Sequence, residues 1–163
     1  MKVWSKIQSK IQDWKTAAAI CKDWQKQGLE MVFTNGCFDI LHYGHVHYLA
    51  EARSLGDRLV IGLNSESSVR RLKGKHRPIN DYLTRTHLLA ALACVDLVVV
   101  FEQDTPLDLI QLLRPDILVK GGDWRVEQIV GSDWVMERGG IVKSLPYVAG
   151  YSTSNIEQKI KRQ

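Results

Sequence analysis

Runs rich in apolar residues alternate with helix-like segments along most of this chain, and that alternation restricts the folds open to it. The apolar runs predict strands at residues 29–34, 58–63, 96–101, 117–120 and 141–145. Helical spacing of apolar residues predicts helices at residues 45–55, 67–72, 84–94, 107–113 and 152–162. Strands that alternate with helices in this way favour an α/β fold, a doubly wound five-stranded parallel sheet.

The amino-terminal segment shows a different pattern. Apolar side chains recur at three- and four-residue steps from Trp4 to Trp24, which predicts one amphipathic helix over residues 4–27 that ends at Gly28. We expect this helix to pack on a single domain of residues 1–163, because the length is that of one domain and no linker or repeat interrupts it. The basic stretch 73–81 is predicted to be a mobile loop.

Composition excludes several classes of protein. Hydrophobic residues make up 45% and charged residues 25% of the chain, which is typical of a globular protein and not of a disordered one. The apolar stretches are too short to cross a bilayer, and the amino terminus lacks the apolar block of a signal peptide. Three cysteines without metal-ligand spacing predict free thiols in a reducing cytoplasm. The net charge of +4 fits an anionic small-molecule ligand, whereas the scattered basic residues argue against nucleic acid as a partner.

The polar segment after the first predicted strand carries the strongest sign of chemistry. Ligands of open α/β sheets bind beyond the carboxyl ends of the strands, and residues 34–45 occupy the first such end. Gly36 permits a tight turn, and Gly44 lets the backbone approach a ligand where the next helix begins. That helix start supplies free N–H groups, and His42 and His45 are spaced so that both can project toward one point.

Three interpretations of the histidine pair follow from the residue types. A phosphate site is favoured, because imidazole donates to phosphate oxygens beside the helix start. Two buried histidines with purely structural hydrogen bonds are the second interpretation. A zinc pair is the third, and it is disfavoured because no third His, Cys or carboxylate stands at ligand spacing.

Residues 36–45 read GCFDILHYGH, and this segment resembles the signature of the HxGH nucleotidyltransferases, the cytidylyltransferase-like family. Three further segments resemble family motifs in the same order: LKGKHRP at 72–78, LVKGGDW at 118–124 and GYSTS at 150–154. The resemblance covers about residues 28–162 and implies the Rossmann-like nucleotidyltransferase fold. We therefore expect the first and fourth predicted strands to be neighbours, so that His45 and Asp123 face one ligand.

Within this family the chain is most similar to the heptose 1-phosphate adenylyltransferases, in a stand-alone form without a fused kinase. The resemblance implies an enzyme that transfers AMP from ATP to heptose 1-phosphate, giving ADP-heptose and pyrophosphate for the lipopolysaccharide inner core. Gly121 and Gly122 leave room for a purine and favour ATP over CTP. A cytidylyltransferase acting on glycerol 3-phosphate or another small phosphate is the alternative enzyme. A non-enzymatic nucleotide-binding scaffold on the same fold, and a homodimer, are left open.

The resemblance also implies the site residues. Those predicted to bind the nucleotide are Asn35, Gly36, Cys37, Phe38, Gly44, His45, Lys120, Gly122, Asp123, Trp124, Tyr151, Ser152, Thr153 and Ser154. The predicted catalytic residues are His42, His45, Lys73 and Arg85. The residues predicted to bind the sugar phosphate are Asp39, Asn64, Lys75 and Arg77. Mg²⁺ is expected to bridge the substrate phosphates without protein ligands.

The implied reaction sets the chemical requirements of the site. The nucleophile is an already ionised phosphate oxygen, so the reaction needs alignment and charge neutralisation but no general base. Three positions depart from the family pattern. Leu83 replaces a usual glutamate and removes any contact through that carboxylate, whereas Ser154 in place of threonine keeps its hydroxyl and Trp124 in place of tyrosine keeps a stacking face.

Overall fold

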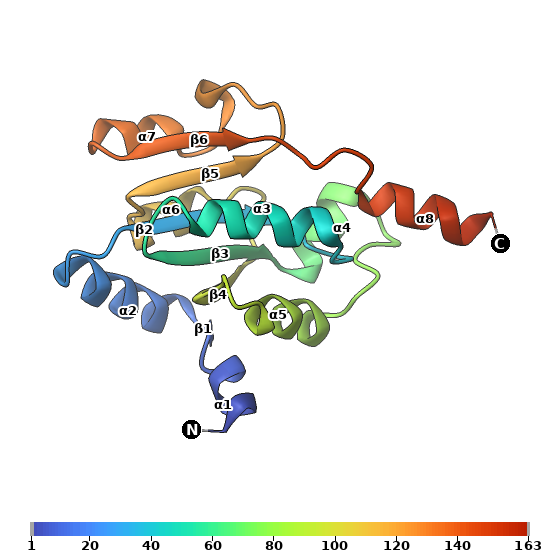
Figure 1. The fold of residues 1–163 in the computed structure, drawn as a ribbon, viewed down its shortest axis with the longest axis horizontal. Coiled ribbons are helices and arrows are strands. Elements are labelled where there is room, and N and C mark those ends of the chain that lie inside the picture. Colours follow the sequence, from blue (N-terminus) through green and yellow to red (C-terminus); the bar gives the residue numbers. More distant parts are fainter. Residues whose placement is uncertain (1, 163) are drawn as a thin grey trace.

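A six-stranded parallel sheet forms the centre of the molecule in the computed structural model, which describes residues 2–162 (Figure 1). The strands are β1 (Ile11–Gln12), β2 (Met31–Gly36), β3 (Arg58–Asn64), β4 (Leu97–Phe101), β5 (Ile117–Gly121) and β6 (Ile141–Leu145). Their order across the sheet is β1-β4-β3-β2-β5-β6, and each neighbouring pair is parallel. The parallel α/β prediction is confirmed, but the predicted number of five strands is wrong.

Strand β2 lies where the direction of winding across the sheet changes. From β2 the chain proceeds through β3 to β4 on one side, and it then crosses back to β5 and β6 on the other. Phe33 of β2 pairs with Leu118 of β5, so the first and fourth predicted strands are direct neighbours, as expected. Such a switch point is where open α/β sheets bind ligands, outside the carboxyl ends of the strands.

Helices cover both faces of the sheet. They are α1 (Val3–Gln8), α2 (Trp14–Lys26), α3 (Tyr43–Arg53), α4 (Glu66–Lys73), α5 (Tyr82–Ala91), α6 (Leu107–Leu113), α7 (Ser132–Glu137) and α8 (Thr153–Lys161). Successive strand side chains point to opposite faces, so the buried strands contribute to two hydrophobic clusters. One cluster packs α2, α6 and α7 against the sheet, and the other packs α3 and α5. The fold is therefore doubly wound.

Local signals in the sequence set several helix starts. The side chains of Asp13, Ser65, Asp81 and Ser152 each accept a hydrogen bond from a backbone N–H in the first turn of the following helix. Strand β4 is apolar at every position because helices cover both of its faces. The helices therefore begin at residues that favour helix starts, and the strand that is covered on both faces has an apolar sequence.

The single helix predicted over residues 4–27 is wrong. The segment forms α1, the short strand β1 and α2, and β1 adds the sixth strand by pairing Ile11 with Val98 at the edge of β4. The Asp13 carboxylate accepts a hydrogen bond from the Thr16 N–H at 2.9 Å and starts α2 as a separate helix. Pairing with the open edge of β4 outweighs the helix propensity of the segment. Helix α7 and a 3-10 turn at Val126–Gln128 have no counterpart among the predicted elements.

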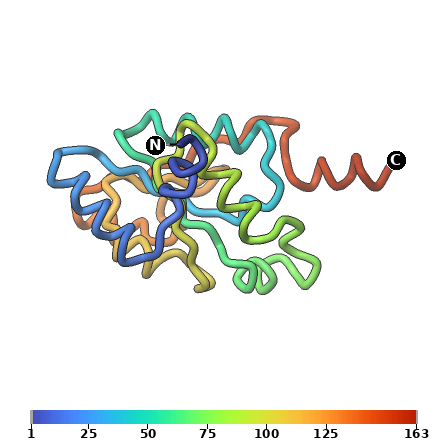
Figure 2. Tube along the Cα trace, turned by 90° about the horizontal axis from the view of Figure 1, so that it is seen from below, coloured from blue at the N-terminus to red at the C-terminus, as the bar shows by residue number. Residues whose placement is uncertain are grey.

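The carboxyl-terminal helix α8 differs from the other long helices. It projects away from the sheet in both views (Figures 1 and 2), and none of its residues is buried. Among residues 2–162 there is no helix with the length and apolar character needed to cross a membrane.

Candidate active site

A cavity of about 400 Å³ opens at the carboxyl ends of β2, β3 and β5, at the switch point of the sheet. The predicted site residues that line it are Asn35, Gly36, Cys37, Phe38, Asp39, His45, Asn64, Lys73, Lys120, Trp124 and Thr153. These residues come from four segments that are far apart in the sequence. The fold therefore brings together parts of all four motifs that the sequence singles out.

The turn between β2 and α3 is shaped for close approach. Phe38 adopts a left-handed backbone with a φ of 42°. A Cβ on Gly44 would lie 3.1 Å from the His42 ring and 3.1 Å from the Cβ of Tyr151, so a larger residue would push these groups apart. His42 stands at the N-cap of α3 without capping it through its side chain, which leaves the helix start available to an anion.

The rings of His42 and His45 stack with their centroids 3.9 Å apart and their planes 21° apart. Burial, with smaller contributions from the charges of His42 and Lys73, lowers the pKa of His45 from 6.5 to about 4. Burial also lowers the pKa of His42. Both Nδ1 atoms are buried without a hydrogen-bond partner in the part of the chain that the structure describes. Unpartnered ring nitrogens favour the ligand-binding interpretation over the structural one, and each neutral ring keeps an N–H to donate.

Lys120 and Asn35 meet at the ends of the neighbouring strands β5 and β2. The Lys120 Nζ donates to the Asn35 Oδ1 at 3.3 Å, and burial lowers the pKa of Lys120. The Trp124 indole donates to a backbone carbonyl at 3.1 Å and leaves much of the ring exposed. Gly122 has a φ of 116°, and a Cβ there would lie 2.9 Å from the ring of Tyr147. An amine, an amide and an aromatic face at one edge of a cavity suit a nucleoside.

Arg85 lies behind the wall of this cavity and is only 1% exposed. Its Nε and Nη2 donate to the carbonyl of Cys37 at 3.0 and 2.7 Å, and its Nη2 also donates to the carbonyl of Asn64 at 2.5 Å. These bonds tie the turn after β2 to the end of β3. The contact of Arg85 with substrate phosphates stays a prediction, because the side chain reaches backbone groups and not the cavity.

Asp39 holds the loop that joins α4 to α5. Its carboxylate accepts hydrogen bonds from the Ile79 N–H at 2.9 Å, the Asn80 N–H at 2.8 Å and the Arg77 Nη1 at 2.7 Å. Burial alone would raise the pKa of Asp39, but these donors outweigh it and hold the pKa below its ordinary value. The carboxylate is therefore ionised and engaged within the chain. The loop predicted to be mobile is tied to the turn after β2 through this residue.

A second cavity of about 440 Å³ adjoins the first and shares His45, Tyr48, Tyr147 and Thr153 with it. Its other predicted site residues are His42, Gly44, Tyr151 and Ser152. The Ser152 hydroxyl caps α8 by accepting a hydrogen bond from the Asn155 N–H at 3.0 Å. The start of α8 therefore faces the start of α3 across this second cavity.

Some predicted site residues line neither cavity. They are Lys75, Arg77, Arg85, Gly122, Asp123 and Ser154. Lys75, Asp123 and Ser154 are exposed to solvent, and their contacts with substrate stay predictions. Strand β5 does lie beside β2, but Asp123 does not line the cavity that His45 lines.

The lining residues that were not predicted include three with polar side chains, Tyr48, Tyr147 and Asp104. Tyr48 follows His45 by three positions and so shares its face of α3, a signal that the sequence contains. Its hydroxyl lies 2.6 Å from the hydroxyl of Thr34 on β2. Asp104 follows the carboxyl end of β4, and the carboxyl ends of strands are where open α/β sheets bind ligands. Tyr147 belongs to the connection after β6 and carries no comparable signal.

Carboxylates are few at this end of the sheet. Within residues 2–162 no group of three His, Cys, Asp or Glu side chains is placed to hold a metal ion.

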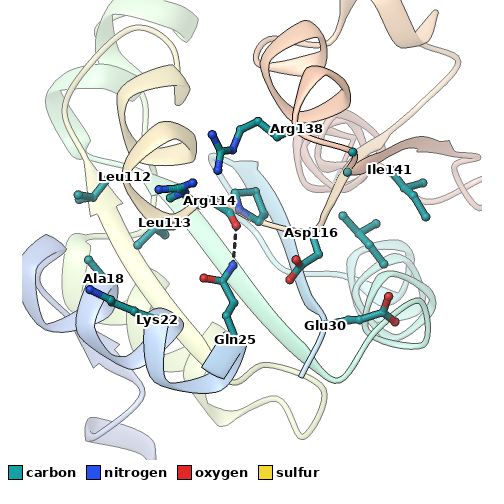
Figure 3. A pocket seen from close by; sticks show the side chains of 14 residues that line it. Ala18, Lys22, Gln25, Glu30, Leu112, Leu113, Arg114, Asp116, Arg138 and Ile141 are labelled. Atoms are coloured by element: carbon teal, nitrogen blue, oxygen red, sulfur yellow. Dashed lines mark hydrogen bonds between the residues drawn. The ribbon is translucent and has the colours of Figure 1, made fainter. Parts of the chain in front are cut away.

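A separate cavity of about 540 Å³ lies at the opposite end of the sheet, where β5 and β6 begin (Figure 3). Charged side chains such as Lys22, Arg114 and Arg138 line it, but none of the predicted site residues does.

A parallel sheet with a cavity at its switch point is a Rossmann-like arrangement, and the stacked histidines at the start of α3, of which His45 lines that cavity and both line the adjoining one, suit a phosphate-bearing ligand. The chain belongs to the cytidylyltransferase-like family, whose sequence profile matches residues 33–159. This match confirms the resemblance drawn from the motifs.

Similar proteins agree with this assignment. The bifunctional protein HldE of Magnetococcus marinus is 56% identical over 154 residues, and that of Syntrophotalea carbinolica is 58% identical over 136 residues. The alignments cover 94% and 83% of this chain but 32% and 28% of those proteins, so the chain spans about a third of their length.

Solved structures share the fold. The lipopolysaccharide core biosynthesis protein of Thermoplasma volcanium is 31% identical with a TM-score of 0.59, and the match covers 74% of this chain and 98% of that one. Pantothenate synthetase of Thermus thermophilus is 16% identical with a TM-score of 0.62, over 93% of this chain and 70% of that one. At that identity the second likeness concerns the fold alone.

Proposed function

We propose that this chain transfers AMP from ATP to heptose 1-phosphate and releases pyrophosphate and ADP-heptose. One observation carries the proposal: the stacked, neutral pair of His42 and His45 stands at the uncapped start of α3, where His45 lines the switch-point cavity and both histidines line the cavity that adjoins it. The four sequence motifs support the choice of substrates. Similarity to a protein described as acting in lipopolysaccharide core biosynthesis supports the sugar class of the acceptor.

The mechanism is an in-line displacement at the α-phosphorus of ATP. A phosphate oxygen of the acceptor forms a new P–O bond, and the bond to the pyrophosphate oxygen breaks. Charge grows on the α-phosphate oxygens, and the His45 ring together with the first-turn amides of α3 stabilises it. Lys73 ends α4 and lines the same cavity, so it adds a positive charge near the phosphates.

The nucleotide occupies the space between β2, β5 and α8. Asn35, Lys120 and Trp124 contact the nucleoside, and Ser152 and Thr153 donate to the phosphates from the start of α8. ATP is preferred over CTP, because the glycines that follow Lys120 leave backbone groups and room for a purine. The acceptor phosphate binds on the side of Asn64 and Lys75, near Asp39 and Arg77.

Mg²⁺ fits this site as an ion held mainly by substrate. The carboxylates that line the cavity, Asp39 and Asp104, already accept hydrogen bonds from Arg77 and Arg71. An ion held by the substrate would require no protein ligands. When bound, it would neutralise phosphate charge and so help the pyrophosphate to leave.

A screen for pyrophosphate release tests the proposal. ATP and CTP are each combined with heptose 1-phosphate, as both anomers, and with glycerol 3-phosphate, in the presence of Mg²⁺. We expect the fastest release from ATP with heptose 1-phosphate, and release slowed about 10²–10³-fold in His45→Ala. Fastest release from CTP with glycerol 3-phosphate would establish the alternative cytidylyltransferase. Tight ATP binding without release from any pair would establish a nucleotide-binding scaffold.

A further inference from the structure

Arg77 joins two segments of the site that are far apart in the sequence. Its Nη1 donates a hydrogen bond at 2.7 Å to the carboxylate of Asp39, in the turn after β2. Its Nη2 forms an ion pair with the carboxylate of Glu157, on the second turn of α8. The side chain of Asp39 is 2% exposed, that of Arg77 17% and that of Glu157 26%. The three charges therefore form a largely buried acid–base–acid network.

The contact with Arg77 is the principal polar tie between α8 and the rest of the molecule. The other hydrogen bonds of α8 remain within residues 150–156: Asn155 donates to Ser152 and to the carbonyl of Gly150. Across residues 2–162, no other ion pair or side-chain hydrogen bond joins α8 to another helix or strand. With no buried residue of its own, α8 gains little from apolar packing.

We infer that Glu157 is a positioning residue, which holds the start of α8 at the mouth of the cavity through Arg77 and Asp39. Ser152 and Thr153 sit at that start, so their distance from the histidines of α3 depends on the network. This inference rests on the proposed function for its effect on ATP, but its effect on α8 is independent of any substrate.

The network also assigns a structural use to Arg77. Two of its nitrogens are engaged by carboxylates of the chain, whereas Lys75 on the same loop is exposed and has no such partner among the ion pairs of residues 2–162. Lys75 is therefore better placed to meet an acceptor phosphate, and Arg77 to position the loop and α8 together.

The first test is Glu157→Gln, which removes the charge and keeps the size of the side chain. Loss of a half-buried charged hydrogen bond should speed amide hydrogen exchange in α8 roughly five- to tenfold in the absence of substrate. The KM for ATP should rise by a similar factor while kcat stays within about twofold, because the histidines of α3 are untouched. Glu137→Gln, at the exposed end of α7, is the matched control and should change neither quantity.

The second test asks whether Glu157 acts through Arg77. In Arg77→Gln, the further change Glu157→Gln should add nothing to the exchange rate of α8 or to the KM for ATP. Additive effects of the two changes would overturn the inference, as would unchanged exchange in Glu157→Gln. Hydrogen exchange is measured on the free protein, so a failure to adenylylate heptose 1-phosphate would leave this result intact and would count against the proposed function only.

Discussion

The start of α3 and the start of α8 both face the candidate site, but the fold holds them in different ways. Helix α3 buries Tyr48, Leu49 and Ala52 against the sheet, and Arg85 fixes the turn that leads into it. Helix α8 buries no residue and projects from the body. One helix start at the candidate site is thus part of the core, and the other is tied to it mainly by the ion pair of Glu157 with Arg77.

The difference in packing between α3 and α8 corresponds to two different requirements of a group-transfer site. Donors that stabilise a transition state must be fixed before the reaction, which requires a packed framework. A segment that covers the bound nucleotide must move to admit and release it, which requires few buried contacts. We expect changes near α3 to affect stability and turnover, and changes near α8 to affect ATP binding and local order.

The largest effect is expected from Arg85→Ala, which removes the tie behind α3. It leaves the carbonyls of Cys37 and Asn64 without their donor and creates a cavity, so the free energy of unfolding should fall by about 3–5 kcal/mol. Urea unfolding measures the loss. Arg70→Ala removes only an exposed ion pair with Glu66 and should cost less than about 1 kcal/mol. Equal losses in both variants would show that Arg85 does not hold the turn.

The next effect concerns turnover. His45→Ala removes a donor at the point where charge appears in the transition state, so kcat should fall by about 10²–10³-fold, or roughly 3–4 kcal/mol. ATP affinity, measured by calorimetry, should stay within about tenfold of the parent. His47→Ala lies on the exposed face of the same helix and serves as the control. Near-parental turnover of His45→Ala would return the histidine pair to the structural interpretation.

A smaller effect should appear in the pH dependence of stability. The folded-state pKa of His45, about 4, lies below the unfolded value near 6.5, so the unfolded chain binds the proton first as pH falls. The contribution of His45 to the free energy of unfolding is therefore fully present above pH 6.5 and is lost progressively as pH falls toward 4. The shift of the His45 pKa corresponds to at most about 3.4 kcal/mol, and partial exposure of the ring reduces this to about 1–2 kcal/mol.

Urea unfolding of the parent and of His45→Gln at pH 7 and pH 4.5 measures this contribution. The parent should lose more free energy of unfolding between the two pH values than the variant does. Asp39 contributes below this window, because its pKa is held below its ordinary value of 3.8. Identical losses in both proteins would contradict the buried, neutral state of His45.

The smallest effect compares two helix caps of the same residue type. Ser65 caps the packed helix α4 and Ser152 caps α8. Each Ser→Ala change should cost about 1 kcal/mol of helix stability. Ser65→Ala should shift the urea midpoint of the whole protein, whereas Ser152→Ala should raise hydrogen exchange in α8 and leave that midpoint nearly unchanged. A global shift from Ser152→Ala would show that α8 is part of the cooperative core.

Local sequence patterns predict much of the architecture. The β-branched run of β4 and the apolar runs of β2, β3 and β5 could be recognised as buried strands, because a parallel sheet covered on both faces needs such runs. The histidines and glycines of residues 36–45 could be recognised because a helix start that binds phosphate needs a tight turn and close backbone approach.

The amino-acid sequence by itself determined the winding of the sheet, the end of the sheet that carries the candidate site, and the motifs that meet there. Only the tertiary structure decided that residues 4–27 break into two helices around β1, that Arg85 and Asp39 engage backbone groups, and that Arg77 reaches Glu157. Each of these depends on groups distant in sequence, such as the open edge of β4 or the carbonyl of Cys37. Periodicity and spacing report the neighbours of a residue along the chain, whereas hydrogen bonds and burial depend on the neighbours that folding brings to it.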